Sequence, residues 1–95
     1  MKAVRIFFYR MDYPDGSILE MTIWEVPEPV EGSEHLLKYS LFYGASGPRL
    51  VGYDNERGNG DHRHIEGREE PYSFTTPEVL IADFLVDVQK LRGEL

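Results

Sequence analysis

Residues 75–93, TTPEVLIADFLVDVQKLRG, form the stretch that sets the fold class, because their pattern differs from everything before them. The threonines offer a helix cap, Pro77 suits the first helical position, and Glu78 favours the positive end of the helix dipole. Apolar residues then recur at three- and four-residue spacing: Val79, Leu80, Phe84, Val88 and Leu91. This spacing predicts an amphipathic helix that lays one face on a core and ends near Gly93.

Upstream of the helix, short segments rich in β-branched and aromatic residues are separated by glycine and proline turns. Five of them read as strands, at residues 3–9, 17–26, 35–44, 49–55 and roughly 61–65. The turns between them are short enough for hairpins, apart from the proline- and glutamate-rich loop after residue 26. The chain is therefore predicted to be a single α+β domain over residues 1–95: an antiparallel sheet of about five strands, with the C-terminal helix packed on one face.

Composition limits the function classes. The 95 residues are 41% hydrophobic and contain no cysteine, so a folded domain is expected and disulfide or thiolate chemistry is excluded. The apolar run at residues 6–9 is too short for a signal peptide or a membrane span, so we expect a cytoplasmic protein that does not enter a membrane. The formal net charge of −7 opposes broad electrostatic binding of nucleic acid and suits a basic partner.

Residues 58–71, GNGDHRHIEGREEP, concentrate more chemistry than any other segment. His62 and His64 are two positions apart, so an extended backbone points both imidazoles to one face and Arg63 to the other. Imidazole titrates near neutral pH and can carry protons without a large shift of its pKa. Two histidines on one face therefore favour an acid–base pair.

The favoured interpretation of this segment is metal-free cleavage of RNA. His62 and His64 are the expected proton carriers, and Arg63 and Arg68 the expected phosphate contacts, with Tyr72, or alternatively Tyr53, as a further donor. The acids in the same segment count against this interpretation unless they pair with the arginines or point away, because they repel a polyanion.

Asp54 is the sixth candidate site residue. If residues 49–55 and 61–65 form a hairpin, Asp54 and Asn55 approach the histidines across the ladder, and Asp54 can orient a ring nitrogen. The alternative is that Asp54 and Asn55 only bond the backbone of the turn that follows them.

A metal site is the less favoured alternative for the histidine pair. It requires a carboxylate as third ligand, and Asp61, Glu66 and Glu69 are the nearest in sequence. The spacing alone is weak evidence for a metal, and two solvated or hydrogen-bonded histidines explain it as well. We therefore expect neither a metal nor any other cofactor.

Four segments carry a resemblance to a known family: YDNERG at 53–58, GDHRH at 60–64, REEPYSF at 68–74 and LIADF at 80–84. They resemble the TumE-type toxins of bacterial toxin–antitoxin pairs. The resemblance implies a small cytoplasmic prokaryotic protein that is neutralised by a partner, often one that is also a DNA-binding regulator. Toxins of other types are commonly ribonucleases, which makes RNA the expected substrate.

Two hypotheses of different class follow. In the first, the chain is a toxin-like component that acts on RNA through the six residues named above. In the second, it is a non-catalytic interaction module whose acidic edge, including Glu69 and Glu70, binds a basic or DNA-binding partner. A metal-dependent hydrolase is a third and less favoured alternative. Association into a homodimer is compatible with all of them.

Overall fold

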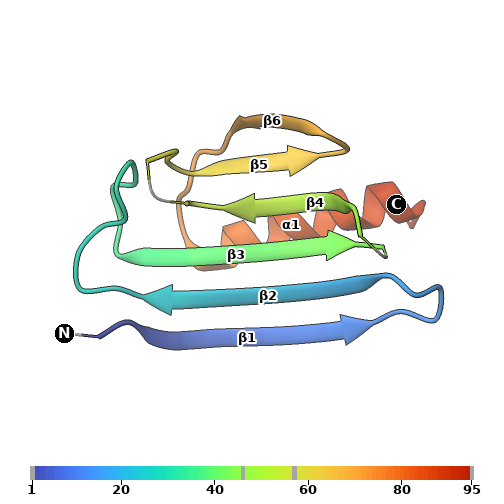
Figure 1. The fold of residues 1–95 in the computed structure, drawn as a ribbon, viewed down its shortest axis with the longest axis horizontal. Coiled ribbons are helices and arrows are strands. Elements are labelled where there is room, and N and C mark those ends of the chain that lie inside the picture. The colour runs from blue at the N-terminus through green and yellow to red at the C-terminus, as the bar shows by residue number, and fades with distance from the viewer. Residues whose placement is uncertain (1, 46, 57, 95) are drawn as a thin grey trace.

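The computed structural model describes residues 2–45, 47–56 and 58–94, and it contains one six-stranded antiparallel sheet. The strands follow one another in chain order across the sheet, so each is joined to its neighbour by a hairpin or loop (Figure 1). Their bounds are β1 Val4–Asp12, β2 Ile18–Glu25, β3 Leu37–Gly44, β4 Arg49–Asp54, β5 His62–Ile65 and β6 Arg68–Pro71. The α+β class and the antiparallel sheet expected from the sequence are confirmed.

The sheet has one strand more than the five expected. The additional strand, β6, pairs with β5 after a turn in which Glu66 and Gly67 both have positive φ, 48° and 87°. A two-residue hairpin loop with a type I′ turn requires positive φ at both of its central residues. Glu-Gly is a weaker sequence signal for this turn than Asn-Gly, and the charged segment 68–71 lacks the apolar alternation of a half-buried strand.

Helix α1, Pro77–Arg92, begins and ends where the sequence predicts. The Thr76 side chain accepts a hydrogen bond from the backbone N–H of Val79, and Gly93 closes the helix with φ 74°. Because that left-handed conformation carries little penalty only for glycine, the helix stops there. The buried side of α1 consists of Leu80, Phe84 and Val88. Val79 was predicted to lie in the apolar stripe, but it is 43% exposed.

The helix lies across β3 and β4 on one side of the sheet, which we call the covered face (Figure 1). The core forms between them from alternate strand residues: Leu19, Met21, Ile23, Tyr39, Leu41, Tyr43, Val51 and Tyr53. The residues between these positions point to the opposite side, which we call the open face. No helix of the described residues is long and apolar enough to cross a membrane.

A buried asparagine ties β4 to β3 and to the loop that precedes it. Asn55 is 0% exposed, accepts a hydrogen bond from the N–H of Tyr39 at 2.9 Å, and donates to the carbonyl of Leu37 at 2.7 Å. It also donates to the Ser33 hydroxyl at 3.2 Å. This amide therefore bonds another strand and not merely its own turn, and it helps to fix where β4 ends.

Replacing Asn55 with alanine is expected to destabilise the fold by roughly 3 kcal/mol, because it leaves the Tyr39 N–H and the Leu37 carbonyl buried without partners. Urea unfolding of the two proteins measures the difference. The control is Asn59→Ala, at an exposed position, which is expected to change stability by less than about 0.5 kcal/mol. Equal effects of the two substitutions would contradict the structural role of Asn55.

Candidate functional site

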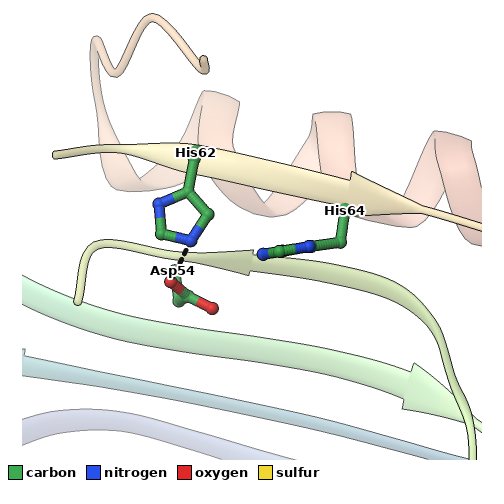
Figure 2. A group of neighbouring side chains, drawn as sticks. All are labelled: Asp54, His62 and His64. Atoms are coloured by element: carbon green, nitrogen blue, oxygen red, sulfur yellow. Dashed lines mark ion pairs between the residues drawn. The ribbon is translucent and has the colours of Figure 1, made fainter. Parts of the chain in front are cut away.

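Antiparallel pairing of β4 with β5 brings three polar side chains together on the open face. Asp54 pairs directly with His62, and Gly52 pairs with His64, so both imidazoles project on the side of the Asp54 carboxylate. Figure 2 shows the two rings and the carboxylate turned toward one another, with the helix behind the strands. His62 Nε2 lies 2.7 Å from Asp54 Oδ1. The predicted approach to the histidines across the ladder is confirmed for Asp54 and is wrong for Asn55, whose side chain bonds β3 instead.

His62 is held on both sides of its ring. Its Nδ1 lies 3.0 Å from the carbonyl oxygen of Gly60, and its Nε2 faces Asp54. The residue is only 6% exposed, so its orientation is set by the fold and not by solvent. A ring whose Nδ1–H donates to a carbonyl presents Nε2 to the cluster.

His64 is the more accessible of the two histidines. Its side chain is 18% exposed, and its Nε2 lies 2.9 Å from Glu69 Oε2 on the neighbouring strand β6. The same Glu69 oxygen lies 3.7 Å from His62 Nε2, and the Glu69 side chain is 57% exposed. Glu69 therefore covers the pair from the edge of the sheet and has room to move away.

Arg49 belongs to this cluster, although the sequence analysis did not select it. Its guanidinium NH1 lies 3.5 Å from Asp54 Oδ2, and its side chain is 40% exposed. The side chain passes over Gly52: a Cβ at that position would lie 2.6 Å from Arg49 Cδ. The available sequence signal was the glycine inside a strand, which commonly marks a close approach of another group.

Arg63 lies on the covered face, away from the histidines, as its alternation with them predicts. Its Nε donates to Glu70 at 2.7 Å, and its NH1 lies 3.2 Å from the Tyr53 hydroxyl and 3.3 Å from Asp87 on α1. The hydrogen bond to Tyr53, followed by the contacts with Glu70 and Asp87, raises the pKa of the guanidinium further above its ordinary value. These contacts join the sheet to the helix.

Tyr72 and Arg68 are also separated from the histidines. The Tyr72 hydroxyl donates to Asp83 of α1 at 2.6 Å, and burial followed by this hydrogen bond raises the pKa of the phenol. Arg68 is exposed and pairs with Ile65 in the β5–β6 ladder. The structure thus brings together Asp54, His62 and His64, and places Arg63, Arg68 and Tyr72 elsewhere.

The two other carboxylates that the sequence suggested as metal ligands do not join the cluster. Glu66 occupies the exposed β5–β6 turn. Asp61 accepts three hydrogen bonds, each of 2.7 Å, from the Ser33 hydroxyl, the Tyr39 hydroxyl and the His35 ring. Burial by itself raises the pKa of Asp61, but these three partners outweigh it and hold the pKa below its ordinary value. Asp61 therefore fastens the loop before β3 to the sheet.

The depressed pKa of Asp61 gives a pH-dependent contribution to stability. The ionised form is favoured by folding, so the contribution is complete above the unfolded-state pKa of about 4 and disappears as the pH falls through the lower folded-state pKa. The difference in unfolding free energy between the wild type and Asp61→Asn is therefore expected to be largest near neutral pH and to shrink below about pH 4. Urea unfolding across this range measures it, and a difference independent of pH would contradict the assignment.

Three ligand atoms of Asp54, His62 and His64 lie within 4.8 Å of one another, a spacing that suits acid–base chemistry and a bound cation alike. The family model described as Toxin TumE matches residues 3–92, which includes the first strands as well as the histidine-rich segment. No curated protein and no solved structure matches the chain significantly. The chain therefore belongs to the TumE family, the toxin components of toxin–antitoxin pairs.

Proposed function

We propose that this toxin cleaves RNA on the open face of its sheet. The observation that carries the proposal is the convergence of His62 and His64 with Asp54 on that face, where a long substrate can reach them. RNA supplies its own nucleophile, the 2′-hydroxyl, so cleavage needs only a group that removes its proton, a group that protonates the leaving oxygen, and a cation for the phosphate.

The geometry distributes these roles unequally. His64 is the partly exposed imidazole and takes the position that meets the substrate, once the exposed Glu69 side chain turns aside. His62 is more deeply placed and is oriented by Asp54 and Gly60, so it serves as the second proton carrier from a fixed position. Arg49 replaces Arg63 and Arg68 as the phosphate contact, because its guanidinium lies beside Asp54 on the open face.

The rest of the open face suits a single strand of nucleic acid. Strand register places Phe8, Trp24 and Phe42 on the face that carries the histidines, and Arg5 lies over the rings of Phe8 and Trp24 at 4.8 and 5.8 Å. Aromatic rings stack with bases regardless of sequence, and nearby arginines add attraction for the backbone. This surface leads from β1 across the sheet to the cluster.

The net charge of −7 argues against RNA binding, but part of the negative charge lies away from the open face. Asp83 and Asp87 belong to α1 on the covered face, where they are hydrogen bonded to Tyr72 and Arg63. Exposed charges separated by more than about 10 Å are largely screened at physiological salt. Acids on the far side of the sheet therefore weigh little against Arg49 at the cluster.

Growth of a bacterial host after induced expression of this chain alone tests the proposal. The wild type is expected to arrest growth, and the His64→Ala and Arg49→Gln variants are expected to relieve the arrest. Purified His64→Ala is expected to cleave RNA at least about 100-fold more slowly, the usual scale of acid–base catalysis. The products should carry cyclic phosphate and 5′-hydroxyl ends, because the 2′-hydroxyl is the nucleophile.

The matched control is Lys90→Gln, which removes one positive charge from an exposed position on the helix, away from the open face. It is expected to arrest growth as the wild type does. Growth arrest with intact RNA would reject RNA as the substrate, and equal toxicity of folded His64→Ala would reject the histidine cluster.

A second surface favours the binding of a partner, and a toxin of this family has a cognate antitoxin. The edge strand β1 exposes Val4, Ile6, Phe8, Tyr9 and Met11, each by more than 40%. An edge strand with an apolar surface on both sides is a template for an added strand. We propose that an extended apolar segment of the antitoxin adds to the sheet beside β1. The acidic edge formed by Glu69 and Glu70 is engaged by His64 and Arg63 and is less available.

Charged substitutions on β1 are expected to break the complex with the antitoxin. Ile6→Glu and Met11→Glu should each weaken it by more than about tenfold, since a buried charge without a partner is costly. The control, Val79→Glu, alters an equally exposed apolar residue on the helix and should leave binding unchanged. Isothermal titration with the antitoxin measures both. Wild-type affinity in the two β1 variants would reject this surface, and a β1-dependent dimer of the toxin alone would assign it to a second copy.

A further inference from the structure

The cluster on the open face has the composition and spacing of a metal site. One ligand atom from each of Asp54, His62 and His64 lies within 4.8 Å of the other two (Figure 2). The Glu69 carboxylate adds a fourth group, 2.9 Å from His64 Nε2. Imidazole nitrogens and carboxylate oxygens in such a set are the donors that Zn²⁺ takes in proteins. We propose that Asp54, His62 and His64 bind a divalent transition-metal ion, with Zn²⁺ the ion that fits, and that Glu69 completes its coordination.

The orientation of His62 supports the proposal independently of the spacing. Metal-binding histidines usually donate the N–H of their other ring nitrogen to a carbonyl or carboxylate, which fixes the ring and directs the free lone pair at the ion. His62 Nδ1 lies 3.0 Å from the Gly60 carbonyl oxygen, and Nε2 points into the cluster. The ring is 6% exposed, so this arrangement is set before any ion arrives.

The contacts of His62 also favour a positive charge, a proton or a metal ion, between its Nε2 and Asp54. When Nδ1 donates to Gly60, the Nε2 of a neutral His62 ring has a lone pair that faces the Asp54 Oδ1 lone pairs at 2.7 Å. Two acceptors at that distance repel each other unless a proton or a metal ion lies between them. A divalent ion would also balance the two carboxylates, Asp54 and Glu69.

The distances are within reach of zinc coordination. Zinc bonds of about 2.0–2.1 Å in a tetrahedron separate the ligand atoms by about 3.4 Å. In the cluster, the Asp54 and His62 atoms are closer than this, at 2.7 Å, and no pair among the three ligands exceeds 4.8 Å. Side-chain movements of roughly 1 Å therefore suffice. Arg49 contacts the other oxygen of Asp54, Oδ2, which leaves Oδ1 for the ion.

Access to the site exists beside His62. A surface hollow of about 140 Å³ is lined by His62 and Glu69, together with Asn59, Asp61, Glu70 and Pro71. Because two of the three ligands come from β5 and the third from its partner β4, paired strands hold the donors in place. The inference goes beyond RNA cleavage and does not rest on it.

Metal binding is tested on the purified full-length protein after exhaustive dialysis against a chelator. Titration with Co²⁺ is expected to give the intense visible absorption of a four- or five-coordinate ion at one equivalent, and Zn²⁺ should displace it. Calorimetric titration with Zn²⁺ measures the stoichiometry and the affinity, and thermal unfolding should show a higher Tm with Zn²⁺ than without it.

Three variants make the result specific. His64→Gln alters a partly exposed ligand and should weaken Zn²⁺ binding by at least about 100-fold, more than loss of an outer contact usually costs. Glu69→Gln should weaken it less, because three ligands remain. His35→Gln changes the histidine outside the cluster and should bind as the wild type does, with circular dichroism confirming that all three are folded. Absence of Co²⁺ absorption in the folded wild type, or equal Zn²⁺ affinity in His64→Gln, would overturn the proposal.

Discussion

The register between β4 and β5 is the constraint on which the rest of the site depends. It sets Asp54 opposite His62 on the open face and Tyr53 opposite Arg63 on the covered face. Because side chains alternate, a slip of one residue would move the histidines under the helix and Arg63 into the open. The register is fixed at the end of β4 by Asn55, which is bonded to β3, and near the start of β5 by Asp61, which is bonded to Ser33 in the loop before β3.

The same alternation divides the charged residues into two groups with different consequences. On the covered face, the helix carboxylates Asp83 and Asp87 meet Tyr72, Tyr53 and Arg63. These contacts attach the helix to the sheet. Their charges are largely screened from a ligand on the open face. On the open face, His62 and His64 face the Asp54 and Glu69 carboxylates, and the partly exposed Arg49 lies beside Asp54. Because successive side chains of a strand point to opposite faces, neighbouring residues of β5 contact the helix on one face and form the candidate site on the other.

The sequence predicts much of the fold because local signals agree with one another. The cap at Thr76, the proline after it and Gly93 mark the helix at both ends, and period-two alternation marks β2 and β3. It also predicts that Arg63 points away from the histidines. It does not predict that Arg49 reaches Asp54, because that contact depends on a side chain crossing Gly52. Nor does it show that Asp61 is engaged with residues 22 to 28 positions earlier, since pairing across the fold leaves no local pattern.

The proposed RNA cleavage and the proposed metal binding both use the nitrogen lone pairs of His62 and His64. Each therefore limits the other. An imidazole whose Nε2 is bound to zinc cannot accept a proton there, and a metal-bound cluster cannot use both rings for acid–base transfer. If both proposals hold, zinc keeps the toxin in a resting form, and a chelator raises the cleavage rate. If cleavage instead requires the ion, a chelator abolishes it; His62 and His64 would then hold the ion, which would supply Lewis-acid chemistry. The sign of the chelator effect therefore separates two chemistries that the positions of Asp54, His62 and His64 allow equally.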